Sequence, residues 1–105
     1  MSAMALTHWT FIYAAGGLPG EGNVQEAVTD ASTTVLAGFP SAAAALDSCT
    51  KGALQDILGS TQLIELCGAF GHEHVAELRR LHPDVPVGLV SYAGDMTAQL
   101  HAIFG

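Results

Sequence analysis

A continuous apolar run that leads into a glycine-bracketed turn and then into a helical pattern is the most constraining feature of this chain. The run, residues 63–67 (LIELC), lacks the strict alternation of a half-exposed strand, so it predicts a parallel strand covered on both faces. Gly68 and Gly71 then permit a tight turn, and residues 72–81 carry apolar side chains at helical spacing. We therefore expect a strand–turn–helix unit over residues 63–81.

The same alternation of strand and helix patterns extends along the rest of the chain. The other expected strands are residues 9–13, 33–39 and 85–91, and the other expected helices are residues 23–31, 41–59 and 93–104. These units predict a single α/β domain over residues 1–105, with a four-stranded parallel sheet in the flavodoxin-like order 2-1-3-4 and helices on both faces. A ferredoxin-like α+β fold is the alternative, and it is disfavoured because a helix is expected after every strand.

Local signals mark several of these boundaries. Asn23 and Glu26 have the spacing of a capping box, and Ser41 is a suitable N-cap for the helix that follows it. Gly52 interrupts that helix and predicts a bend or an early stop. Pro86 favours a sheet edge for the last strand.

Composition limits the classes of partner that we expect for this protein. Half of the residues are apolar, and a domain of this size buries only about 60–65% of its unfolded-chain surface, so we expect a homo-oligomer. The net charge is −7 with only three Lys and Arg residues, which argues against nucleic acid and anionic membranes as partners.

Location and processing are also constrained by the sequence. No apolar run reaches the ~20 residues that span a bilayer, and Met1 to Ala5 lacks the basic start of a signal peptide, so we expect a cytoplasmic protein. Because Met4 follows closely, we interpret residues 1–3 as an expression remnant. Cys49 and Cys67 belong to no C-x-x-C pair, which favours free thiols over a disulfide.

Three candidate catalytic residues lie close together in the sequence: Glu65, Cys67 and His72. Strand alternation places Glu65 and Cys67 on one face, and covering helices would desolvate the carboxylate into an acid or base that works near neutrality. A helix N-terminus after Cys67 would favour a thiolate, and it would keep His72 neutral. The structural alternatives are a paired carboxylate, a packed thiol and a capping or surface histidine.

In the expected order the first and third strands flank the switch point, where ligands of open α/β sheets bind. This arrangement brings the first loop beside the turn at residues 68–74. The candidate ligand-binding residues are Tyr13, Gly16, Gly17, Phe39, Gly68, Phe70, Gly71, Tyr92 and Asp95. The glycine-rich loop at residues 16–22 lacks the P-loop motif and is better interpreted as a flexible flap.

Metal binding has only weak support in the sequence. His72 and His74 are about 200° apart around a helix, so they cannot both face one metal ion, and we predict no metal and no cofactor.

Residues 63–75, LIELCGAFGHEHV, together with residues 85–90, VPVGLV, resemble a family of short bacterial proteins of about one hundred residues. Members share a FIY-type first strand, a strand ending in LIELCGxFGHE and a VPVG strand. The resemblance covers most of the chain and implies an α/β fold, but it implies no activity. It also implies that Glu65, Cys67, Gly68, Phe70, Gly71, His72 and Glu73 act as a unit.

These features favour a small cofactor-independent enzyme of the isomerase, lyase or cyclase type. Glu65 or His72 would supply acid/base chemistry on a small molecule that carries a carbonyl or carboxylate, and the amides at residues 68–72 would hold its anionic group. The alternative is a non-catalytic oligomeric module that binds a ligand or serves as a scaffold, in which the same residues pack and cap.

Overall fold

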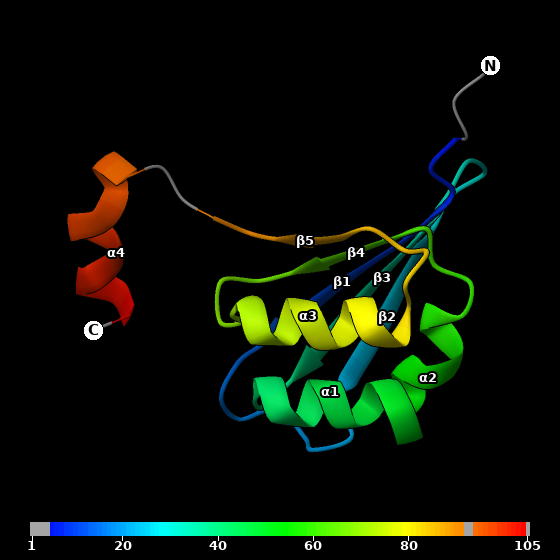
Figure 1. Ribbon diagram of the computed structural model, residues 1–105, viewed down its shortest axis with the longest axis horizontal. Helices are drawn as coiled ribbons and strands as arrows, with labels where there is room; N and C mark the ends of the chain where they lie inside the picture. Colours follow the sequence, from blue (N-terminus) through cyan, green and yellow to red (C-terminus); the bar gives the residue numbers. More distant parts are fainter. Residues whose placement is uncertain (1–4, 92–93, 105) are drawn as a thin grey trace.

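The computed structural model describes residues 5–91 and 94–104, which form a five-stranded sheet with helices packed on one side (Figure 1). The strands are β1 (His8–Ala14), β2 (Asn23–Val28), β3 (Thr33–Phe39), β4 (Leu63–Leu66) and β5 (Val87–Leu89). The helices are α1 (Ala42–Lys51), α2 (Ala53–Leu58), α3 (His72–Leu81), the short 3-10 helix η1 (Gly94–Met96) and α4 (Thr97–Phe104). The α/β class is confirmed.

The sheet order is β2-β3-β1-β4-β5. Strands β3, β1, β4 and β5 are parallel and follow the predicted 2-1-3-4 order, whereas β2 is antiparallel to β3 and makes the sheet mixed. The prediction of a purely parallel four-stranded sheet is therefore wrong at one edge.

The helix predicted over residues 23–31 is wrong, because residues 23–28 form the edge strand β2. Apolar residues at helical spacing produced that prediction, but Val24 and Val28 also suit strand alternation, and a six-residue segment is too short to separate the two periods. The chain then reverses at a turn in which the Thr29 N–H donates to the Ser32 carbonyl at 2.8 Å. Pairing with β3 satisfies the backbone, so tertiary context overrides the local pattern.

The helix layer follows the predicted boundaries closely. The Ser41 hydroxyl accepts a hydrogen bond from the Ala44 N–H at 3.1 Å and caps α1. Gly52 divides the predicted helix into α1 and α2, and Gly59 ends α2. Helix α3 has the predicted bounds, residues 72–81.

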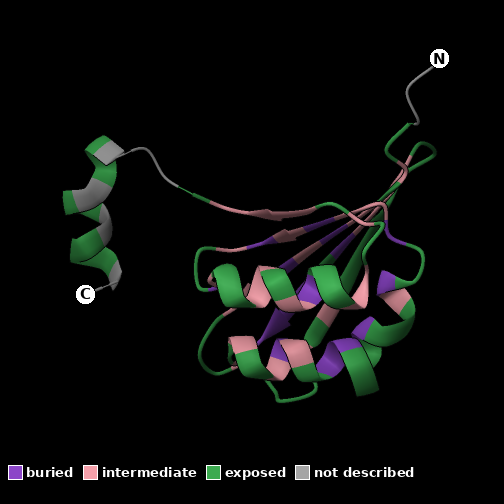
Figure 2. Ribbon diagram, in the orientation of Figure 1, coloured by how far each residue is buried: buried purple, intermediate pink, exposed green. Residues whose placement is uncertain are grey.

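The core lies between the helices and one face of the sheet. Alternate residues of the central strands point into it, and all are at most 6% exposed. They are Ile12, Val35, Ala37, Phe39, Ile64 and Leu66. Leu54, Leu58 and Leu78 are buried on the helix side of the same cluster (Figure 2).

Helices α1, α2 and α3 all cover the same side of the sheet, and within residues 5–91 and 94–104 no helix lies on the opposite face (Figure 1). The expectation of helices on both faces is therefore wrong. Side chains that alternate with the core residues lie half-buried or exposed on this second side, which we name the open face. On β1, β3 and β4 its residues are Trp9, Phe11, Tyr13, Thr34, Leu36, Leu63 and Glu65.

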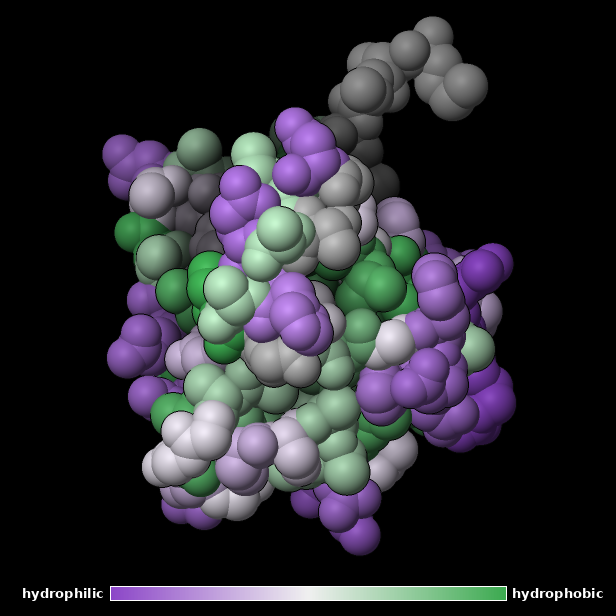
Figure 3. All heavy atoms as spheres, turned by 90° about the vertical axis from the view of Figure 1, so that its left-hand side faces the viewer, coloured by the Kyte–Doolittle hydropathy of each residue, from purple (hydrophilic) through white to green (hydrophobic). Residues whose placement is uncertain are grey.

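Helix α4 stands apart from the sheet (Figure 1). The sequence pattern predicts that Met96 and Ile103 lie on the inner side of this last helix, but Met96 is 46% exposed and Ile103 is 73% exposed, so that prediction is wrong. Figure 3, which views the molecule from the side on which α4 stands, shows apolar residues at the surface among the polar ones.

Candidate functional site

The carboxyl ends of β1 and β4 lie side by side, as the predicted strand order requires. The Cys67 N–H donates to the Ile12 carbonyl at 3.0 Å, which continues the pairing of the two strands past Leu66. The Phe70 N–H donates to the Cys67 carbonyl at 3.1 Å and closes the turn. Tyr13, the next residue of β1, is therefore placed beside this turn.

Glu65 lies on the open face, on the strand next to the centre of the sheet. It pairs with Phe11 of β1 on one side and with Gly88 of β5 on the other. A Cβ at Gly88 would lie 3.7 Å from the Glu65 Cγ, which is an ordinary van der Waals contact, so the glycine lies directly beside the Glu65 side chain. Glu65 is half-buried, although no helix covers its face.

The two thiols differ in environment, and both are free. Cys67 is half-buried, packs against the core cluster, and accepts a long hydrogen bond from the Ala69 N–H at 3.5 Å. The Cys49 thiol is buried in α1 and donates to the Ala45 carbonyl at 3.3 Å. Burial raises the pKa of Cys49 to about 11, so this thiol stays protonated at neutral pH, which agrees with a packing role.

The histidines of the turn have different roles. Gly71 is the N-cap of α3, and His72 is the exposed first residue of the helix. The Nδ1 atom of His74 accepts a hydrogen bond from the Gly71 N–H at 2.8 Å, and its ring meets Phe70 edge-on at 5.5 Å. His74 therefore occupies the place that Glu or Gln takes in a capping box.

Sequence reasoning missed this role of His74, although its position three residues after the N-cap was a signal. Among residues 5–91 and 94–104, no group of three or more His, Cys, Asp or Glu side chains could hold a metal ion.

Glu65 and His72 do not share a face. Glu65 points to the open face, whereas α3 packs on the opposite side of the sheet through Leu78 (Figure 2). Glu65 is therefore the candidate catalytic residue on the open face, and His72 belongs to the rim of the helix layer.

The aromatic candidates also divide between the two faces. Phe39 and Phe70 are buried in the core, at 0% and 4% exposure. Tyr13 stacks with Phe11 on the open face, with ring centroids 6.4 Å apart. A Cβ at Gly38 would clash with the Tyr13 ring, so the tyrosine leans over β3 and away from Cys67.

The remaining candidates lie at the surface. Gly16, Gly17 and Gly68 are exposed, and so is Asp95 in η1. The loop that holds Gly16 and Gly17 borders a hollow against α1, lined in part by Gly20, Glu21, Asp47 and Lys51. Tyr92 and residues 1–3 lie outside the described residues.

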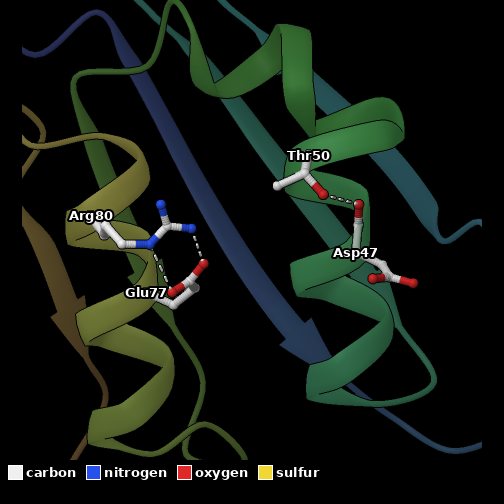
Figure 4. A network of polar contacts seen from close by, with 4 residues as sticks. All are labelled: Asp47, Thr50, Glu77 and Arg80. Atoms are coloured by element: carbon white, nitrogen blue, oxygen red, sulfur yellow. Dashed lines mark hydrogen bonds and ion pairs between the residues drawn. The ribbon is translucent and has the colours of Figure 1, made fainter.

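Polar pairs on the helix surface are structural. Arg80 donates two hydrogen bonds to Glu77 within α3, and the Thr50 hydroxyl donates to the Asp47 carbonyl within α1 (Figure 4). The hydrogen bond from Arg80 lowers the pKa of Glu77. Both pairs lie on the helix side of the sheet, so neither reaches Glu65.

A family model described as "Family of unknown function (DUF6506)" matches residues 7–105. The chain belongs to this family. The match covers every strand and helix of the fold, including β2 and α4, so DUF6506 comprises the whole α/β unit. No curated protein and no solved structure shows significant similarity to the chain.

Within the part of the chain that the structure describes, we find no helix with the length and apolar character needed to span a bilayer.

Proposed function

We propose that the open face binds a small molecule that carries a carbonyl or carboxylate, and that Glu65 acts on it by acid/base chemistry. The observation that supports this proposal is the setting of Glu65. Its side chain lies on a face whose other side chains on β1, β3 and β4 are mostly apolar, with Thr34 as the polar exception, and it lies directly beside Gly88. A positioned carboxylate beside an apolar surface is suited to proton transfer at a carbon next to a carbonyl.

The stacked rings of Phe11 and Tyr13 supply a flat apolar surface for the body of such a ligand. Glu65 would remove a proton from the carbon next to the carbonyl and return it at another position, which is the chemistry of an isomerase; a lyase or cyclase would begin with the same proton removal. This reaction needs no cofactor, because the proton both leaves and returns through the same side chain. An anionic ligand group would bind the turn at residues 68–72 through the N–H groups of Gly68 and His72, because those of Ala69, Phe70 and Gly71 donate within the turn.

Solvent deuterium exchange tests the proposal directly. The protein would be incubated in D₂O with a panel of 2-oxo and 3-oxo carboxylic acids, and proton NMR would follow exchange at the carbon next to the carbonyl. We expect catalysed exchange with at least one acid and a loss of at least about 100-fold in Glu65→Gln, within the range of general acid/base catalysis. Glu26→Gln is the matched control, because Glu26 pairs with the core residue Val35 on the opposite side of the sheet.

The second candidate is a non-catalytic oligomeric module. The exposure of Leu36, at 39% on the open face, favours it, because a large exposed apolar side chain on an uncovered sheet suits an assembly surface. Exchange that is absent for every acid, or equal in wild type and Glu65→Gln, would reject the enzyme and leave this candidate.

A further inference from the structure

Helix α4 and the 3-10 turn before it present exposed apolar side chains at positions that the structure describes. The helix has eight residues, and isolated helices shorter than about 12–15 residues are marginal in water. Ile103 is nevertheless 73% exposed, and Met96 at the adjoining 3-10 turn is 46% exposed. The helix stands clear of the sheet in Figure 1. A stable α4 therefore requires a second surface to pack against.

The open face has the complementary property of an apolar surface without a helix. The seven residues named for it include one charged side chain, Glu65, and α4 contains one ionisable residue, His101. The whole chain carries a net charge of −7, so two copies repel each other over most of their surfaces. The open face and α4 are regions where that repulsion is weak.

We propose that the α4 helix of a second copy covers the open face, in a reciprocal dimer. An eight-residue helix is about 12 Å long and 10–12 Å wide, so docking one side of it buries roughly 250 Å² of accessible surface on each partner. Two reciprocal contacts bury roughly 1,000 Å² in total, which reaches the lower end of the sizes found for specific interfaces. One contact alone falls below that range, so the exchange must be mutual.

The radius of gyration and the accessible surface of the chain are both larger than those of a compact domain of the same size, as expected if the open face and α4 are not covered within one chain. The radius of gyration is 14.5 Å, compared with about 12.9 Å for a compact domain of this length. The accessible surface is 6624 Å², compared with about 5,500 Å² for a compact monomer of this mass. The inference does not depend on the proposed chemistry, although the helix of the second copy would also enclose Glu65.

Light scattering coupled to size-exclusion chromatography tests the dimer with the full chain. We expect wild type to have the mass of two chains. Ile103→Glu and Leu36→Glu should each weaken the dimer by at least about tenfold, because each buries an unpaired charge at the contact. Val28→Glu is the matched control and should remain dimeric, since Val28 is 68% exposed on the edge strand and belongs to neither surface.

Because Ile103 and Leu36 are exposed, neither substitution should unfold the monomer, and circular dichroism checks this. A wild type with monomer mass at all concentrations, or an Ile103→Glu variant that stays as dimeric as Val28→Glu, would overturn the proposal. Cysteine trapping distinguishes an α4 helix that covers the open face of a second copy from one that covers the open face of its own chain. A mixture of Leu36→Cys and Ile103→Cys proteins should form a disulfide-linked heterodimer, whereas a bond found only within the chain of the double variant would also overturn it.

Discussion

Gly17 and Gly22 form a matched pair that separates backbone strain from packing in the first loop. Both have φ of +89°, in the left-handed region that disfavours residues with a Cβ. A Cβ at Gly17 would meet no atom within 4 Å, whereas one at Gly22 would lie 2.5 Å from the ring of Phe39. That ring is fully buried, so it cannot move aside without disturbing the core.

The two substitutions to alanine should therefore have different costs. Gly17→Ala should destabilise by about 1 kcal/mol, because strain of about 1–2 kcal/mol is partly offset by the reduced entropy of the unfolded chain. Gly22→Ala carries the same backbone cost and adds about 1–3 kcal/mol for overpacking against Phe39. We expect a total of about 2–4 kcal/mol for Gly22→Ala.

Urea unfolding followed by circular dichroism measures both variants against wild type. With a slope of about 1–3 kcal/mol/M, the midpoint should fall by roughly 1–2 M for Gly22→Ala and by less than 1 M for Gly17→Ala. In the double variant Gly22→Ala/Phe39→Leu, the combined cost should be smaller than the sum of the single costs, because the smaller side chain makes room. Equal destabilisation of the two alanine variants would refute the packing argument and leave only backbone strain.

Three further predictions test the helices. Ser41→Ala removes the acceptor for the Ala44 N–H and should cost about 1 kcal/mol in urea unfolding, whereas Ser41→Asp should retain most of the stability. His74→Ala leaves the Gly71 N–H without its acceptor, so amide exchange at the start of α3 should accelerate while the end of α3 is unchanged. The raised pKa of Cys49, about 11, favours the thiol in the folded state, so this contribution to stability is complete below about pH 9 and is lost toward pH 11. Cys49→Ala should lack that loss in urea unfolding at alkaline pH, and thiol labelling of wild type should modify Cys67 faster than Cys49.

The elements that the sequence predicted correctly carry redundant signals. Helix α3 has an apolar face and glycines before it, so its bounds follow from local chemistry alone. The order of the parallel strands follows from short connections and right-handed crossovers, which leave few alternatives. The placement of Glu65 on the face opposite Ile64 and Leu66 needed only strand alternation.

The elements that the sequence did not predict depend on contacts between distant segments. Residues 23–28 form a strand because they pair with the free edge of β3, and the sequence of those six residues alone does not show that such an edge is available. The role of His74 depends on how the turn places the Gly71 N–H. The contacts of Tyr13 with Gly38 and of Glu65 with Gly88 form only when neighbouring strands are in register, because each glycine contacts a side chain of the next strand.

The wrongly predicted helix and the open face have one cause. The crossovers from β3 to β4 and from β4 to β5 advance in the same direction across the sheet, so right-handed connections place their helices on the same side. Only the connection from β1 to β3 runs in the opposite direction, and it contains the strand β2 in place of a helix. The open face is therefore a direct consequence of the topology, and among the described helices only α4, of this copy or another, remains to cover it.

The acid/base site at Glu65 and the reciprocal dimer can be tested separately, because different residues of the open face and α4 carry them. Glu65→Gln changes one carboxylate on the open face and should leave the dimer intact, whereas Ile103→Glu removes the proposed cover and leaves the carboxylate in place. If the helix of the second copy builds the site, both variants should lose deuterium exchange, but only Ile103→Glu should become monomeric. Exchange retained by a monomeric Ile103→Glu would show that the site works uncovered, and the dimer would then have a purely structural role.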